Sequence, residues 1–201
     1  RATNLSARRK SHGSRRGDRG PRRRRSTGQA EPGRKSAIRL RRRPDENAWE
    51  LVHPRCARER ADDIAEVQTM IDAGELEIAR DELLWLIRDC QDFIEAHCLL
   101  GQLALIGNDL PLARGHFGYA YRLGLGALPA GKAPGMVPYR LSANRAFFES
   151  GKGLAWSLEQ LGKRELALEV VDTLLALDPD DPLGLAEMQT RLAQGDEPAA
   201  K

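Results

Sequence analysis

Long apolar runs, cysteines and aromatic residues are all scarce in this chain of 201 residues. No run of about 18 apolar residues occurs, which excludes a transmembrane helix. The Arg-rich beginning also lacks the apolar segment that a secretory signal needs. We therefore expect no membrane association and a cytoplasmic location. Because the first residue is Arg1 and not Met, we expect a partial or processed chain, or a reading frame extended past its true start.

The cysteines are few and odd in number. Of the three, Cys90 and Cys98 lie within otherwise apolar helical patterns, where a thiol behaves as a small apolar side chain. We expect all three, including Cys56, to be reduced. A metal site built from His53 and Cys56 with His97 and Cys98 is the alternative, but only the first pair has the spacing of zinc ligands. The sequence therefore predicts no metal.

Opposite charges divide the chain. The first 45 residues hold 17 basic and three acidic residues, a net charge of about +14, whereas the rest holds 15 basic and 26 acidic residues, about −11. A segment so rich in Arg, Gly and Ser has too little apolar surface to offset the entropy of ordering it. We expect a disordered tail over residues 1–45, a linker over 46–59 and a disordered end over 196–201.

Runs of arginine in the tail suggest phosphate binding. The runs are Arg22, Arg23, Arg24 and Arg25, then Arg41, Arg42 and Arg43. Clustered arginines neutralise phosphates and release counterions, whereas interleaved aromatic residues that would stack on bases are missing. The tail is thus a candidate for RNA, DNA or ribosome binding without sequence preference. Two alternatives stay open: it folds back onto its own acidic domain, or it is translated upstream DNA.

An internal repeat organises the rest of the chain. Three similar segments recur, namely Gly74–Ala79, Asn108–Ala113 and Gly162–Ala167. The first step is 34 residues, and the second is 54, which equals 34 plus an insertion of 20. Apolar residues at helical spacing flank each segment, so every unit predicts a helix, a tight turn and a second helix. The predicted units cover residues 60–93, 94–127 and 148–181.

Small and aromatic residues fall at matching positions of these units. The landmarks are Leu100, Gly101, Ala113, Phe117 and Ala120 in the second unit, and Leu154, Ala155, Gly162, Ala167, Asp178 and Pro179 in the third. The first unit is a weaker match, with Glu66 and Val67 in place of the Leu-Gly pair. This pattern resembles the tetratricopeptide repeat (TPR) family. The resemblance implies an all-α, right-handed superhelical stack of three helical pairs over residues 60–195.

A stack of helical pairs needs a polar cap, because a single pair cannot bury its own apolar face. Residues 182–194 predict a capping helix, with Asp181 as its N-cap and Pro182 as its first helical residue. Residues 125–147 are an insertion that begins as a loop, since its prolines exclude a continuous helix. From Ser142, a possible N-cap, one long helix can run to residue 161. We expect the loop to lie at the edge of the groove.

Catalytic motifs are missing, so the sequence predicts no active site, no cofactor and no enzymatic activity. The closest approach is Gly126–Ala133, which has the spacing of a nucleotide-binding P-loop but ends in Ala133 in place of the Ser or Thr that holds magnesium. Paired acids such as Asp62 and Asp63 lie at predicted helix starts, where they interact favourably with the helix dipole.

In the TPR family the first helix of each unit lines a concave groove. The resemblance places eight side chains on that face: Gln68, Glu95, Gln102, Glu149, Lys152, Trp156, Glu159 and Gln160. Family members that hold the C-terminal carboxylate of a chaperone use Lys, Asn and Arg residues there. In this chain Ile64 and Cys98 stand where Lys is needed. The resemblance therefore implies a basic or amphipathic peptide ligand.

The three tryptophans receive different predictions. Trp156 is a candidate anchor for a ligand, since large aromatic residues are enriched at binding hot spots, and packing under the insertion loop is its alternative role. Trp85 is expected in the core, and Trp49, in the linker, carries no prediction. The leading hypothesis is a non-enzymatic scaffold that binds a partner protein in the groove. The rival is a nucleic-acid- or ribosome-associated protein that binds through its tail. The oligomeric state is left open.

Overall fold

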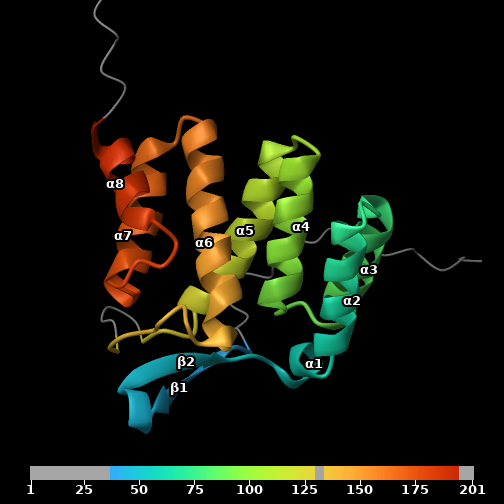
Figure 1. Ribbon diagram of the computed structural model, residues 1–201, viewed down its shortest axis with the longest axis horizontal. Coiled ribbons are helices and arrows are strands. Elements are labelled where there is room, and N and C mark those ends of the chain that lie inside the picture. The colour runs from blue at the N-terminus through green and yellow to red at the C-terminus, as the bar shows by residue number, and fades with distance from the viewer. Residues whose placement is uncertain (1–36, 130–133, 195–201) are drawn as a thin grey trace, which may run out of the picture. The chain divides into compact units, whose positions relative to one another are not determined.

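The computed structural model describes residues 37–129 and 134–194. The predictions for Arg22 to Arg25 and for residues 196–201 lie outside them. The described chain is mostly helical, as expected, but it also contains a β-hairpin (Figure 1). Its elements are β1 (Arg39–Arg43), a 3₁₀ turn (Pro44–Glu46), β2 (Ala48–Val52), α1 (Arg55–Arg58), α2 (Ala61–Asp72), α3 (Leu76–Asp89), α4 (Ile94–Ile106), α5 (Leu110–Leu125), α6 (Ser142–Gln160), α7 (Arg164–Leu177) and α8 (Leu185–Gln194).

Three antiparallel helical pairs, α2–α3, α4–α5 and α6–α7, follow one another in chain order, and α8 packs on α7. The turn inside each pair contains one residue with positive φ: Gly74 at 80°, Asn108 at 57° and Gly162 at 70°. Glycine and asparagine tolerate this left-handed conformation better than other residues. These turns occupy equivalent places in the predicted repeat, so its spacing corresponds to the observed helix-turn-helix pairs.

Alanine at one repeated position allows the helices to approach closely. Ala79, Ala113 and Ala167 lie in the first turns of α3, α5 and α7, and all three are completely buried. A larger side chain there would force the paired helices apart, because protein interiors are packed about as densely as organic crystals. The alanines that recur in the sequence are therefore buried at equivalent positions of the three pairs.

Two groups of buried residues make up the core, and α4 contributes to both. Ile94 and Cys98 belong to the larger group with α5, α6 and α7, while Leu99 and Leu103 belong to a smaller group with α1, α2 and α3. A helix that is apolar on all sides is expected to be buried on all sides. Helix α4 therefore joins the first helical pair to the rest of the stack.

Residues 39–52 form an antiparallel hairpin, which corrects the prediction of a disordered tail to residue 45 followed by a linker. Leu40 and Leu51 face each other across the strands, and Arg41 faces Glu50. Leu51 is fully buried and Leu40 packs against the larger core group. The Arg-rich composition of β1 concealed this strand, in which Leu40 is the only apolar residue.

Asn144, at the start of α6, fastens the hairpin to the helices. Its side chain is fully buried, and its Oδ1 accepts a hydrogen bond from the Leu51 backbone N at 2.9 Å. Its Nδ2 donates to the backbone oxygens of Trp49 at 3.1 Å and Pro138 at 2.9 Å. The Asn144 side chain thus bonds backbone groups of β2 that the partner strand β1 leaves free on that side. Trp49, for which the sequence made no prediction, packs against the core in this region.

A disulfide joins Cys56 in α1 to Cys90 at the end of α3, so the prediction that all three cysteines are reduced is wrong. It also removes Cys56 from the alternative zinc site with His53, whose Nε2 donates instead to the backbone oxygen of Ala143 at 2.7 Å. Cys98 is a free, buried thiol, as expected. The two bridging cysteines are one repeat length apart, at 34 residues.

The insertion and the cap differ in detail from the predictions. Helix α6 begins at Ser142, but Leu141 and not Ser142 is its N-cap residue. Helix α8 begins at Leu185, not at Pro182. Asp181 still caps it, because its carboxylate accepts hydrogen bonds from the backbone N of Leu185 at 2.6 Å and of Ala186 at 2.9 Å. A loop of three residues, Pro182 to Gly184, therefore separates the cap from the helix, and Gly184 closes it with a φ of 68°.

Candidate partner-binding surface

Helices α4 and α6 pack side by side and bring together four of the predicted groove residues. We call the face formed by these residues the α4–α6 surface: Glu95, Gln102, Glu149 and Trp156. Gln68 is exposed on α2 and donates only to Asp72 of its own helix, at 3.0 Å. No described contact joins Gln68 to the other four residues.

Two carboxylates, those of Glu95 and Glu149, interact across this surface. Loss of hydration raises the pKa of Glu95, and the negative charge of Glu149 raises it further. In the described part of the chain, no Lys or Arg forms an ion pair with either carboxylate. The pair therefore carries negative charge that the described residues do not neutralise.

Tyr139, from the insertion loop, holds Glu149 in place. Its hydroxyl donates to Glu149 Oε1 at 2.9 Å, and the Arg145 guanidinium lies 5.8 Å from its ring centroid. Loss of hydration and this hydrogen bond raise the pKa of Tyr139. Asp178, at the end of α7, accepts from the Tyr139 backbone N at 2.7 Å and so fixes the loop. The described part of the loop thus contacts α6 at Glu149.

Cys98 lies beneath the same surface. Burial raises its pKa to about 12, a hydrogen bond with Ser150 opposes this, and the charges of Glu149 and Glu95 add to the increase. A thiol with so high a pKa stays protonated at neutral pH and is a poor nucleophile. Cys98 is therefore part of the packing between α4 and α6. Gln102, one turn further along α4, donates weakly to the Cys98 sulfur at 3.8 Å.

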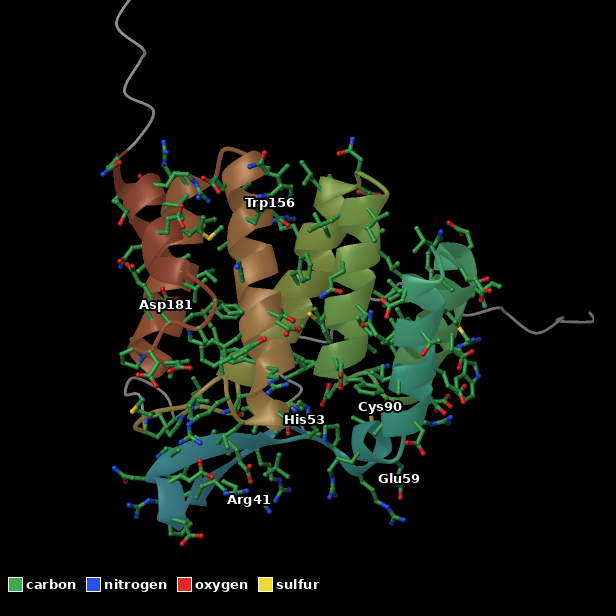
Figure 2. All side chains as sticks on the ribbon, viewed as in Figure 1. Arg41, His53, Glu59, Cys90, Trp156 and Asp181 are labelled. Carbon is green, nitrogen blue, oxygen red and sulfur yellow. A yellow bond between two sulfur atoms is a disulfide. The ribbon has the colours of Figure 1, made fainter. Side chains whose placement is uncertain are left out.

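Trp156 lies two turns beyond Glu149 on α6, with 38% of its surface exposed. Figure 2 shows it near the end of α6 that is far from the hairpin, whereas the described part of the insertion loop lies at the opposite end. Packing under that part of the loop therefore does not account for this residue. An exposed indole near a pair of carboxylates is a suitable contact for an amphipathic ligand.

Lys152 and Glu159 were predicted to contact a ligand, but both bind other parts of the chain. Lys152 Nζ donates to the backbone oxygen of Leu183 at 2.7 Å. Glu159 forms a two-pronged ion pair with Arg191 of α8, with both distances at 3.0 Å. This pair lowers the pKa of Glu159. The two residues hold the capping helix against α6, while the neighbouring Gln160 remains exposed.

Trp85 was expected in the core, but 38% of its surface is exposed. The Arg60 guanidinium lies 4.3 Å from the centre of its ring, a cation–π arrangement. The apolar residues around Trp85 in the sequence concealed its position, because Leu83 and Leu86 face the core whereas Leu84 and Trp85 do not.

The arginines of β1 were predicted to contact nucleic acid, but they are engaged within the hairpin. Arg41 and Arg43 both pair with Glu50, which is only 6% exposed, and Arg43 also donates to Glu46 at 3.2 Å. Arg42 donates to Asn47 Oδ1 at 3.2 Å. These hydrogen bonds reduce what the three side chains can offer to phosphates.

Asn144 and Asp178 position the site but were missed by sequence reasoning. Asn144 is a polar residue at helical spacing from Phe147 and Phe148, within the apolar stripe of α6. A polar residue in such a stripe signals a buried hydrogen-bonding role. Asp178 was recognised only as a family landmark. The residues around it in the sequence do not indicate that its carboxylate accepts a hydrogen bond from the backbone of Tyr139.

The described residues meet the requirements of neither a metal site nor a membrane span, but they do form an open hollow. No group of three or more His, Cys, Asp or Glu side chains in this part of the chain is placed to hold a metal ion. None of the helices described here is both long and apolar enough to cross a bilayer. An open hollow of about 400 Å³ lies between α7 and α8, away from the predicted residues. It is lined by Leu168, Asp172, Gln189, Thr190, Ala193 and Gln194.

Comparisons with known proteins identify no relative: no protein-family model matches the chain, and no curated protein is significantly similar to it.

Proposed function

We propose that this chain is a TPR-type scaffold that binds a basic or amphipathic segment of a partner protein and catalyses no reaction. The fold supports this through three successive helical pairs whose turns and buried alanines recur at matching positions. Repeats of this kind stack into elongated surfaces that suit extended ligands. The right-handed superhelix implied by the family resemblance belongs to the same proposal.

The Glu95–Glu149 pair is the observation on which the proposal mainly rests. The negative charge of Glu149 raises the pKa of Glu95 beyond the effect of lost hydration, and a positive group near both carboxylates would be favoured. A Lys or Arg side chain from a partner would neutralise the pair and donate hydrogen bonds to its carboxylate oxygens. Trp156 would then contact an apolar residue of the partner about two helical turns away, at roughly 10 Å.

The experiment is a quantitative comparison of the proteins captured by the unmutated chain, by Glu95→Gln and by Trp156→Ala. Leu112→Ala is the matched control, since Leu112 is also exposed but lies on the second helix of its pair. We expect the same partner to be depleted by both surface variants and retained by the control. An unchanged set of captured proteins would count against the α4–α6 surface.

The rival function, RNA, DNA or ribosome association, rests on the composition of residues 1–36 and on no contact in the described chain. The engagement of Arg41, Arg42 and Arg43 within the hairpin removes part of its support. Arg22 to Arg25 lie outside the described residues and remain its candidates.

The cytoplasmic location inferred from the sequence also remains a proposal. The Cys56–Cys90 disulfide bears on it, because disulfides persist mainly in oxidising compartments and are uncommon in the cytosol. Alkylating the free thiols of the protein as isolated from its source, before any reductant is added, decides between the two. Labelling at Cys56 would favour a reducing compartment, and protection of Cys56 an oxidising one.

A further inference from the structure

Helix α3 has more exposed large apolar side chains than any other described helix. Of the eight large apolar residues that are exposed in the described chain, three lie on α3, and no other described helix has more than one. The three are Ile78, Leu84 and Trp85, with 57%, 39% and 38% of their surfaces exposed. Such grouping is unusual at the surface of a soluble domain and often marks an interaction site.

Ile78 and Trp85 are seven residues apart, so they lie on one face of α3, two turns from each other. Asp81 and Glu82 lie between them along the helix. We call the face defined by Ile78, Asp81, Glu82 and Trp85 the α3 face. Ile78 and Trp85 are two turns apart. This spacing matches the apolar residues of an amphipathic helix that packs alongside α3, because the apolar residues of such a helix also recur every two turns.

Trp85 contacts an arginine on this face. The Arg60 guanidinium stacks on its ring at 4.3 Å. Arg60 is itself fixed by Asp63 at 3.0 Å and by Asp89 at 3.6 Å. An aromatic side chain held in one position loses little freedom when a partner binds, which favours affinity.

Acidic residues concentrate on the same helical pair. Residues 61–89, which span α2 and α3, contain nine acidic and two basic residues, a net charge of −7. The acids are Asp62, Asp63, Glu66, Asp72, Glu75, Glu77, Asp81, Glu82 and Asp89. By contrast, residues 94–125 contain two acids and two arginines, and residues 142–177 contain five acids and four basic residues. The negative charge therefore belongs to the first pair and not to the repeats in general.

From the exposed apolar residues and this charge together we propose that the α3 face is a second docking surface, which binds a positively charged amphipathic helix of a partner protein. The apolar stripe of that helix covers Ile78 and Trp85, and its Lys or Arg residues contact the surrounding acids. A second copy of the same face is disfavoured as the occupant, because the acids of two such helical pairs would repel each other. This surface is separate from the α4–α6 surface and can carry a different partner.

The probe for the test is a synthetic helical peptide of about 18 residues with leucines on one face and lysines on the other. A peptide with the same leucines, but with glutamates in place of the lysines, is its charge control. Both are titrated by calorimetry into the full, oxidised protein. We expect the lysine peptide to bind, to bind less tightly as salt is raised, and the glutamate peptide to show no binding.

Ile78→Gln and Leu112→Gln are the matched protein variants, since these residues occupy equivalent positions in α3 and α5 and both are exposed. Neither side chain is in the core, so both variants should fold. We expect Ile78→Gln to weaken binding of the lysine peptide roughly tenfold, whereas Leu112→Gln leaves it within about twofold. Trp156→Ala, on the other surface, should also leave it unchanged.

Three results would overturn the proposal. One is equal binding by Ile78→Gln and the unmutated protein, and another is binding of the lysine peptide that only Trp156→Ala weakens. The latter would assign the peptide to the α4–α6 surface and so support the first proposal at the expense of this one. The third is a dimer in analytical ultracentrifugation that Ile78→Gln dissociates, because a second copy would then be the occupant.

Discussion

Phe117 lies directly against the backbone of Gly101, so that a Cβ atom at Gly101 would be only 2.6 Å from Phe117 Cδ1. A Cβ atom at Gly153 would meet the same ring at 2.7 Å from Cζ. The ring of this α5 residue therefore fills space left by glycines on both α4 and α6. These two helices carry Glu95 and Glu149, so the contact sets the geometry of the α4–α6 surface.

Gly101→Ala should destabilise the protein by about 1–3 kcal/mol, because overpacking forces the ring or the helix to shift. Gly115→Ala is the control: it lies in α5, and an added Cβ there meets nothing within 4 Å. This change should be neutral or stabilise by up to about 1 kcal/mol, since alanine favours a helix more than glycine does. Urea unfolding measures both. Equal effects of the two substitutions would contradict the packing role of Gly101.

Asn144→Ala should detach the hairpin from the helices. It removes three hydrogen bonds and leaves buried partners at Leu51 and Pro138, and a partly buried one at Trp49, without them. We expect a loss of about 2–4 kcal/mol and faster hydrogen exchange at the Leu51 amide. Ser142→Ala, at an exposed position of the same first turn, should change neither quantity by much. Normal protection of the Leu51 amide in Asn144→Ala would contradict this role.

Reduction of the Cys56–Cys90 disulfide should lower the free energy of unfolding by about 3–4 kcal/mol, as expected for a loop of this length. Urea unfolding with and without a dithiol reductant measures the difference. In Cys56→Ser the reductant should have no further effect. Three free thiols in the unfolded protein before reduction would show that the bond is not formed.

Glu95→Gln should stabilise the protein at neutral pH. A carboxyl whose pKa is raised in the folded state contributes stability below its unfolded pKa and loses it as pH rises through the folded pKa. The benefit of the substitution should therefore shrink as the pH falls toward 4. Glu159→Gln is the opposite case. The pKa of Glu159 is lowered, mainly by its hydrogen bonds with Arg191, so this substitution should cost stability at neutral pH and less in acid. Unfolding curves across pH measure both effects. A change of the same sign in the free energy of unfolding for the two substitutions at neutral pH would contradict the opposite pKa shifts of Glu95 and Glu159.

Polynucleotide binding, if the rival function holds, should depend on residues 1–36. The comparison uses the full chain and a chain that starts at residue 37, because a cut at residue 46 would divide the hairpin. For six to ten phosphate contacts, affinity should fall by roughly 10³ to 10⁵ between about 50 and 200 mM salt. Binding that survives the deletion, or is insensitive to salt, would exclude the electrostatic explanation.

Much of the helical architecture was predictable because it depends on local patterns. The positions of Gly74, Asn108 and Gly162 located the turns, and the spacing of apolar residues located the helices. Boundaries were less reliable, as at α8, where Asp181 caps a helix that begins at Leu185. Glu95 and Glu149 were placed on one face only through the family resemblance, and their interaction became visible in the structure.

The sequence alone determined the helical pairs, the small residues between them and the separation of charge, because periodicity and composition are carried by neighbouring residues. Tertiary structure decided the rest. Asn144 lies 93 residues from Leu51, and Cys56 lies 34 residues from Cys90. The partners of Lys152, Glu159 and Trp85 likewise come from other elements. Whether a polar side chain is free for a ligand depends on which distant groups the fold brings to it, and no local pattern encodes that.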